Sequence, residues 1–236
     1  MIPAHEMRRL AAIATPERPL QDLVAMRSRG RPLQYLEGTA DFGPLTLAVD
    51  DRVLIPRPET EYLADLVVHR HSQPGLVVDL CTGSGAVALF LKAAWPQSRV
   101  VATDSSVDAL AVARENAHRL GLDIEWHSGD LFGALPGDLR GRVDLLVANP
   151  PYVSEDEWEL LPEDVRQEPR SALVAGPEGT EIIDRLLDGV GDWVVRGGEA
   201  WIEIGEMQGP YLRSHHRVQI HQDQYGKDRF AMVTID

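Results

Sequence analysis

Hydrophobic and polar positions are arranged differently on the two sides of Gly75. After this glycine, short β-branched runs alternate with stretches in which apolar residues recur at helical spacing. Such an alternation is typical of a parallel sheet with helices packed on it. Strands are predicted over residues 76–80, 99–104, 124–128, 143–149 and 199–204, with helices between them.

The end of the chain follows a different pattern. Apolar runs over residues 218–223 and 229–235 are separated by the turn residues Tyr225, Gly226 and Lys227. Two β-prone runs joined by a short turn predict an antiparallel hairpin. With this hairpin, the sequence predicts an α/β fold built on a seven-stranded, mostly parallel sheet.

The residues before Gly75 predict a smaller unit. Residues 1–30 place apolar side chains around two prolines, which indicates one or two short helices. Residues 34–55 are β-prone and are interrupted by a Gly-Pro pair, so an antiparallel pair of strands is expected, followed by a helix over 59–69. The predicted division is a short N-terminal helical segment with a β-hairpin over 1–56 and a main domain over 57–236.

Composition narrows the classes of function. The chain has 23 Lys and Arg against 37 Asp and Glu, a net charge of −14, which repels a phosphate backbone. The one dense basic stretch, Arg27, Arg29 and Arg31, fits a solvated helix end better than a nucleic-acid contact. A single cysteine suits a reducing compartment, and no apolar run approaches the roughly 20 residues that span a bilayer. We therefore expect a cytoplasmic protein that binds neither nucleic acid nor a membrane.

Histidines do not indicate a metal site. His69 with His71, and His215 with His216, lack the companion carboxylates or cysteines that a zinc site needs. Surface positions are expected for both pairs, and no metal is predicted.

A glycine-containing turn follows the first strand of the main domain. The stretch DLCTGSG runs from Asp79 to Gly85 and leads into an apolar helix. Gly83 and Gly85 allow a close approach of backbone to ligand, and the N–H groups at the helix start can bind an anion such as a carboxylate. Asp104 ends the next strand, where a carboxylate can accept both hydroxyls of a ribose. Together these features predict an adenosine-bearing ligand.

The glycine pattern leaves two classes of cofactor open. Gly83, Gly85 and Ala88 also fit the G-x-G-x-x-A pattern of dinucleotide-binding dehydrogenases. Asp79 within the strand, ahead of an extended turn, resembles the first motif of Rossmann-like methyltransferases, where it helps to seat the methionine portion of the cofactor. A capping or turn carboxylate is the structural alternative for Asp79.

The most specific motif is Asn149-Pro150-Pro151-Tyr152, directly after the strand VDLLVA. An amide nitrogen is a poor nucleophile because its lone pair is delocalised into the carbonyl. The Asn149 side-chain oxygen and the Pro150 carbonyl can each accept a hydrogen bond from one NH2 group, and the prolines fix the backbone that carries them. Tyr152 offers an aromatic face to a flat amide, guanidinium or base. A turn that merely ends a strand is the structural alternative.

With these motifs in this order, the chain resembles the HemK/PrmC family of glutamine N5-methyltransferases that act on peptide-chain release factors. The matching stretches are PLQYLEG, LIPRPETE, DLCTGSGAVAL, Asp104, GDLF at 129–132, NPPY, DVRQEPRSAL and Gly226. The resemblance implies a Rossmann-like class I methyltransferase that uses S-adenosyl-L-methionine.

The resemblance also implies roles for individual residues. The residues expected to contact the cofactor are Asp79, Cys81, Thr82, Gly83, Ser84, Gly85, Asp104 (the ribose), Leu131 (the adenine), Asp130 (a weaker adenine contact) and Asn149. The residues expected to bind the target glutamine are Asn149, Pro150, Pro151 and Tyr152. Arg57, Thr60 and Glu61 belong to a loop expected to fold over the pocket, with a capped helix start as the alternative.

The chain also departs from the family pattern. Family members carry several N-terminal helices that help to dock the release factor, whereas only about 30 residues precede PLQYLEG here, so most of that domain is expected to be missing. Cys81 stands where the family usually has glycine, and Leu131 where an aromatic residue is common. The connection between EAWIEIG and VQIHQD is also shorter than the family helix that it replaces. The missing helices and this shorter connection lie on the substrate side more than on the cofactor side, so they bear on the identity of the methyl acceptor rather than on the methyl-transfer chemistry.

The predicted function is methyl transfer from S-adenosylmethionine to the side-chain amide of a glutamine in a protein such as a release factor. A small metabolite with an amide, amidine or guanidine nitrogen is the alternative acceptor. NPPY also suits the amino group of a nucleic-acid base, against which the acidic charge argues. A cofactor-binding subunit that activates a partner is the non-enzymatic alternative.

Overall fold

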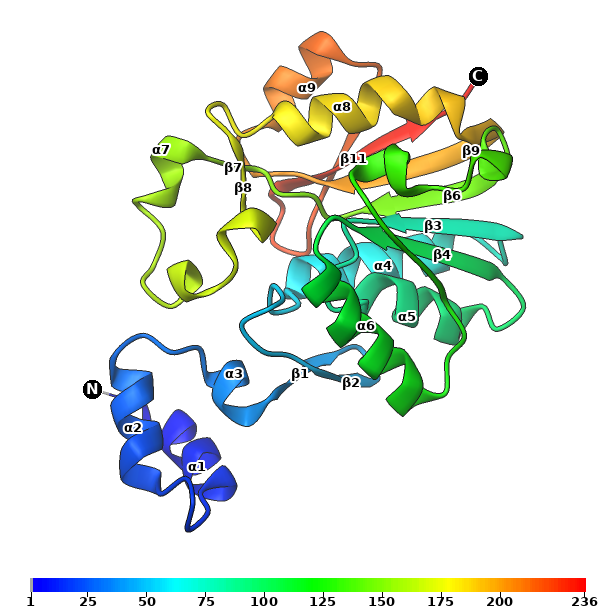
Figure 1. The fold of residues 1–236 in the computed structure, drawn as a ribbon. Helices are drawn as coiled ribbons and strands as arrows, with labels where there is room; N and C mark the ends of the chain where they lie inside the picture. Colours follow the sequence, from blue (N-terminus) through cyan, green and yellow to red (C-terminus); the bar gives the residue numbers. More distant parts are fainter. Residues whose placement is uncertain (1) are drawn as a thin grey trace.

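A seven-stranded sheet forms the centre of the molecule (Figure 1). The computed structural model describes residues 2–236, without the side chain of His215. The strand order is β10-β11-β9-β6-β3-β4-β5, and β9, β6, β3, β4 and β5 run parallel, while β11 is antiparallel to both of its neighbours. The strands are β3 (Leu76–Leu80), β4 (Arg99–Asp104), β5 (Glu125–Ser128), β6 (Val143–Ala148), β9 (Val194–Glu203), β10 (Gln219–Gln222) and β11 (Asp228–Thr234).

Helices cover both faces of this sheet, and Figure 1 shows α8 and α9 on the face opposite α4, α5 and α6. Their bounds are α4 (Pro58–Arg70), α5 (Ala86–Ala94), α6 (Val107–Leu120), α8 (Glu181–Gly189) and α9 (Gly209–His215). All five residues of β3 are buried, and Val77 and Val78 point into different apolar clusters on the two faces. This double burial explains the unbroken apolar runs from which the parallel strands were predicted. In the described part of the chain, no helix is long and apolar enough to cross a membrane.

The predicted α/β fold class, with its mostly parallel sheet and C-terminal hairpin, is confirmed. Strands β3 and β4 have the predicted bounds, whereas β9 begins at Val194, five residues before the predicted start at 199. Gly197 and Gly198 interrupt the apolar pattern there, so the first part of this strand carries no periodic signal. The pairing of β9 with β6 also shifts register between Val143 and Leu145.

The N-terminal segment contains three helices. They are α1 (Ala4–Ile13), α2 (Leu20–Ser28) and α3 (Leu33–Glu37), and they share a cluster formed by Leu10, Leu23, Leu33 and Leu36. The sequence predicted β structure from residue 34, which is wrong for residues 34–37. Local propensity there is overridden because a helix buries Leu33 and Leu36 against the first two helices and ends at Gly38, whose φ is 74°.

The predicted antiparallel pair is present as β1 (Thr39–Phe42) and β2 (Leu45–Ala48). Phe42, Leu45 and Leu47 are buried in the same cluster as residues of α4 and α5. On α6, the Asn116 amide accepts a hydrogen bond from Ala48 N at 2.6 Å and donates one to Ala48 O at 3.0 Å. The hairpin therefore shares a core with the helices of the sheet, while α1 to α3 share their own.

Two arginines of the basic stretch at the end of α2 form ion pairs within the protein. Arg27 forms an ion pair with Glu6 at 2.7 Å, and Arg31 forms one with Asp51 at 3.3 Å. These contacts connect α2 to α1, and the segment after α2 to the loop after β2.

A small additional unit lies between β6 and α8. It consists of β7 (Val153–Ser154), α7 (Glu155–Trp158) and β8 (Val174–Gly176), with β7 and β8 paired in parallel. Among residues 2–236, the structure also has five short 3-10 helices: η1 (Leu131–Ala134), η2 (Gly137–Leu139), η3 (Val165–Gln167), η4 (Arg170–Ala172) and η5 (Val190–Asp192). The sequence did not predict β7 and β8, because strands of two or three residues are too short to show a period.

Candidate active site

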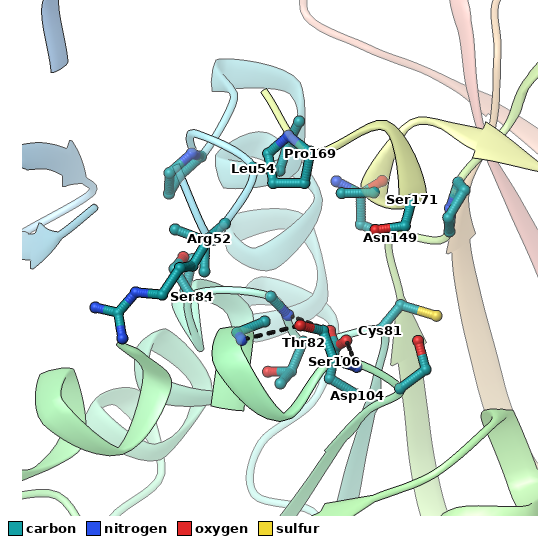
Figure 2. A pocket seen from close by; sticks show the side chains of 18 of the residues that line it. Arg52, Leu54, Cys81, Thr82, Ser84, Asp104, Ser106, Asn149, Pro169 and Ser171 are labelled. Carbon is teal, nitrogen blue, oxygen red and sulfur yellow. Dashed lines mark hydrogen bonds between the residues drawn. The ribbon is translucent and has the colours of Figure 1, made fainter. Parts of the chain in front are cut away.

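A cavity of about 310 Å³ lies at the carboxyl ends of β3, β4 and β6. The predicted cofactor residues that line it are Asp79, Cys81, Thr82, Gly83, Ser84, Asp104 and Asn149. The predicted substrate residues that line it are Thr60, Asn149 and Pro151. Figure 2 shows two groups of lining residues. The lower part of the view holds Cys81, Thr82, Ser84, Ser106 and Asp104, and the upper part holds Asn149, Ser171, Pro169 and Leu54. The structure thus brings the two sequence motifs to one cavity, where ligands bind in open α/β sheets.

The two glycines of the turn have different surroundings. Gly83 has a φ of 55°, lines the cavity, and would place an added Cβ in open space. Gly85 has a φ of 83°, and an added Cβ would lie 3.1 Å from Trp126 Cη2 and 3.2 Å from Ala113 Cβ. Gly85 is not part of the cavity lining. Gly83 therefore leaves room for a ligand, and Gly85 allows α5 to pack closely against its neighbours.

Asp79 lies at the base of the turn and is 1% exposed. Its Oδ2 accepts hydrogen bonds from Thr82 Oγ1 at 2.6 Å and from Ala88 N at 3.1 Å. The second bond caps the first turn of α5, as the structural alternative for this residue predicted, although Asp79 also lines the cavity. Burial raises the pKa of Asp79 to about 7. A positively charged ligand in the cavity would favour its ionised form.

Asp104 joins the end of β4 to the glycine turn. Its Oδ2 accepts from Gly83 N at 2.8 Å, and its Oδ1 accepts from Ser106 N at 2.8 Å. Burial raises the pKa of this carboxyl as well. Each carboxylate oxygen has a second lone pair, so Asp104 can still accept hydrogen bonds from two hydroxyls of a ligand.

Asn149 belongs to a chain of hydrogen bonds that continues away from the cavity. Its Nδ2 donates to Thr60 Oγ1 at 2.9 Å, and Thr60 Oγ1 donates to Glu203 Oε2 at 2.6 Å. The hydroxyl of Tyr152 donates to Glu203 Oε1 at 3.2 Å. Glu203 ends β9, is 1% exposed, and has its pKa raised to about 7 by burial. One buried carboxyl is therefore linked to both ends of the Asn-Pro-Pro-Tyr corner, directly to Tyr152 and through Thr60 to Asn149.

Glu168 fastens the loop before α4 to the opposite wall. Its Oε1 accepts from Arg57 Nη2 at 2.5 Å and its Oε2 accepts from Ile55 N at 2.9 Å. Pro56 on one side of this clasp and Pro169 on the other both line the cavity. The stretch around Glu168, to which sequence analysis assigned no chemical role, closes this part of the wall.

Several predicted site residues lie outside this cavity lining: Arg57, Glu61, Gly85, Asp130, Leu131, Pro150 and Tyr152. Tyr152 lines a separate depression of about 740 Å³. Asp130 forms an ion pair with Arg185 at 2.5 Å, and Leu131, with a φ of 47°, packs in the core beside the sheet. The adenine contacts of these two residues stay predictions.

Two side chains that form hydrogen bonds with the candidate site residues were missed by sequence reasoning. Glu203 is one, and Gln208 is the other. Gln208 Nε2 donates to Tyr152 O at 3.0 Å and to Gly179 O at 2.9 Å, while its Oε1 accepts from Gly205 N. For Glu203, the sequence signal was a carboxylate in an otherwise apolar strand end. Such a residue is unexpected in a core unless it has hydrogen-bonding partners.

No group of histidine, cysteine and acidic side chains in the described residues could hold a metal ion. His71 contacts Glu199 at 3.1 Å and His216 contacts Asp184 at 2.9 Å. The side chain of His215 lies outside what the structure describes.

Residues 59–176 match the family model described as methyltransferase small domain. A release factor glutamine methyltransferase from Streptococcus pneumoniae is 39% identical, over 91% of this chain and 78% of that protein. Proteins of the same name from Mycobacterium leprae and Deinococcus radiodurans are 40% and 37% identical, over 94% and 89% of this chain and 82% and 77% of their own lengths. The chain belongs to the release factor glutamine methyltransferase family. The resemblance drawn from the motifs is thereby confirmed, and the dehydrogenase interpretation of the glycine turn is not favoured.

Solved structures of other methyltransferases have the same fold as this protein. A ribosomal protein L11 methylase from Lactobacillus delbrueckii has a TM-score of 0.55 at 22% identity, covering 75% of this chain and 79% of that one. A 16S rRNA N2 methyltransferase from Thermus thermophilus, in complex with AdoMet and guanosine, has a TM-score of 0.63 at 16% identity, covering 84% of this chain and 50% of that one. The Rossmann-like methyltransferase fold is therefore confirmed.

Proposed function

We propose that this protein transfers a methyl group from S-adenosylmethionine to the side-chain amide nitrogen of a glutamine in a peptide-chain release factor. One observation carries the chemistry. The NH2 of Asn149 donates to Thr60, and in the described structure no hydrogen bond engages Asn149 Oδ1. Because Asn149 lines the cavity, this oxygen is available to accept a hydrogen bond from a ligand there.

The cavity residues fit the proposed cofactor. When bound, S-adenosylmethionine supplies an electrophilic methyl group on a positively charged sulfur. Asp79 and Asp104 are carboxyls whose pKa values are raised by burial, and a nearby cation would stabilise their charged forms. Asp104 would hold ribose hydroxyls, and the open space beside Gly83 admits a ligand against the backbone.

The chain's own contribution is to orient the acceptor. The Asn149 oxygen and the Pro150 carbonyl would accept one N–H each from the glutamine NH2, which directs the face of its nitrogen toward the methyl group. Neither Pro150 nor Pro151 has a backbone N–H that could compete for these acceptors. No base in the cavity is required if the product releases its extra proton to water.

The release factor is proposed as partner because the relatives carry that name over most of this chain. A small metabolite is not favoured as acceptor, since none of these relatives is named for one. A net charge of −14 argues against a nucleic-acid substrate. Action on a release factor would place the protein in the cytoplasm.

The test is mass spectrometry of purified release factors and of a metabolite extract after incubation with isotopically labelled S-adenosylmethionine. The expected result is one labelled methyl group on a glutamine of a release factor. Label that enters only metabolites would contradict the proposed acceptor. Calorimetric titration with S-adenosylhomocysteine and, separately, with NAD tests the cofactor, and heat with NAD alone would contradict the proposed cofactor.

A further inference from the structure

Glu203 lies one hydrogen bond beyond the residues of the cavity. It is fully buried, it does not line the cavity, and it contacts both Thr60 and Tyr152. Burying a carboxylate is costly unless hydrogen bonds compensate for its lost hydration. At a position that serves only the core, an apolar side chain would avoid this cost. Its position next to the Asn-Pro-Pro-Tyr corner points to a role there.

The direction of the hydrogen bonds defines that role. A threonine hydroxyl has one proton, and when Glu203 is ionised that proton is donated to Glu203 Oε2, 2.6 Å away. Thr60 Oγ1 can then only accept from Asn149, so the asparagine must present its NH2 to Thr60. The Asn149 oxygen is left for the ligand.

We propose that Glu203 is a positioning residue that fixes the orientation of the Asn149 side-chain amide through Thr60, so that the site presents an oxygen rather than an NH2 to the methyl acceptor. This inference rests on the proposed function and adds a specificity element to it. An oxygen at that position accepts from a glutamine NH2 and repels a glutamate carboxylate. Glu203 would thus help the enzyme to distinguish glutamine from glutamate.

Replacing Glu203 by glutamine removes the constraint at nearly constant volume. A glutamine at this position can donate to Thr60, which frees the threonine proton to donate to Asn149 Oδ1. The Asn149 amide can then rotate and present its NH2 to the cavity. The change acts through two hydrogen bonds, because residue 203 does not touch the cavity itself.

The experiment compares wild type with Glu203→Gln and with the matched control Glu199→Gln. Glu199 is on the same strand and is 8% exposed, but it pairs with Arg70 at 2.7 Å and does not line the cavity. A second variant, Thr60→Val, removes the relaying hydroxyl and keeps the test available if Glu203→Gln does not fold. Each variant is assayed on a release-factor fragment that contains the unmethylated target glutamine. The same fragment with that glutamine replaced by glutamate serves as the competitor.

We expect Glu203→Gln and Thr60→Val to lower kcat about 10- to 100-fold. Affinity for S-adenosylhomocysteine should stay within about threefold of wild type, and the preference for the glutamine fragment over the glutamate fragment should shrink at least about tenfold. Glu199→Gln should keep both kcat and preference. A variant at Glu203 that folds and retains wild-type kcat and preference overturns the inference, as does a loss of kcat with the preference unchanged. If wild type labels no glutamine at all, it is the proposed function that fails.

Discussion

The glycine turn provides a paired test, because Gly83 and Gly85 are separated by a single residue and alanine is expected to affect them in opposite ways. At Gly85 an alanine would hold a left-handed backbone with φ of 83°, which costs about 1–2 kcal/mol. Its Cβ would also lie 3.1 Å from Trp126 and 3.2 Å from Ala113, and such overpacking typically adds about 1–3 kcal/mol. We expect Gly85→Ala to lower the free energy of unfolding by about 2–5 kcal/mol, with a drop in Tm of roughly 5–15 °C.

Gly83→Ala should behave differently. Its backbone is also left-handed, with φ of 55°, but its Cβ would meet no atom within 4 Å, so only the conformational cost of about 1–2 kcal/mol applies. The added methyl group would occupy space in the cavity that the cofactor is proposed to fill. We therefore expect affinity for S-adenosylhomocysteine to fall at least about tenfold, which corresponds to about 1.4 kcal/mol.

Thermal melting and calorimetric titration of the two variants measure both quantities. The expected pattern is a large stability loss with retained ligand affinity in Gly85→Ala, and the reverse in Gly83→Ala. Equal loss of ligand affinity in both variants at matched stability would refute the division of roles between the two glycines.

Three further predictions concern the site and its support. Asn149→Ala should lower methyl transfer at least about 100-fold and keep S-adenosylhomocysteine affinity within about tenfold, so retained turnover would remove this residue from the mechanism. Asn116→Ala, which removes bonds to both backbone groups of Ala48 and to Ser84 O, should lower the free energy of unfolding in urea by about 2–4 kcal/mol; a change under about 1 kcal/mol would contradict the bridging role. Burial raises the pKa of Glu203 from 4.5 to about 7, so protonation of this side chain stabilises the folded protein. This contribution to the free energy of unfolding is fully present below pH 4.5 and is lost as pH rises through 7. Between pH 5 and 8 the Tm of wild type should therefore fall more steeply than that of Glu203→Gln, and parallel curves would count against the raised pKa.

The sequence predicted the sheet well where burial is simple. β3 and β4 are covered on both faces, so neither strand alternates between apolar and polar residues, and their bounds could be taken directly from the residues. The helix α3 was not predicted, because its formation depends on Leu33 and Leu36 packing against α1 and α2 rather than on local propensity. Tertiary contacts decided that segment.

The cavity was predicted in outline for a similar reason. Asp104 and Asn149 follow parallel strands, whose ends meet at one edge of the sheet, so their convergence could be expected from order alone. The partnership of Thr60 with Glu203 could not, because those residues are 143 positions apart and neither stands in a motif with the other. Nor does the turn motif itself distinguish Gly83, which faces the cavity, from Gly85, which faces the core.

The clasp formed by Glu168 has a consequence for how the protein matures. Its partners Ile55 and Arg57 precede it by 113 and 111 residues, so during synthesis the loop before α4 leaves the ribosome long before the residue that fastens it. Contacts at such separation form late because the intervening chain must first be ordered. A nascent chain that ends before Glu168 has the glycine turn but lacks one wall of the pocket, so we expect it to hold the proposed methyl donor less tightly than the finished protein does.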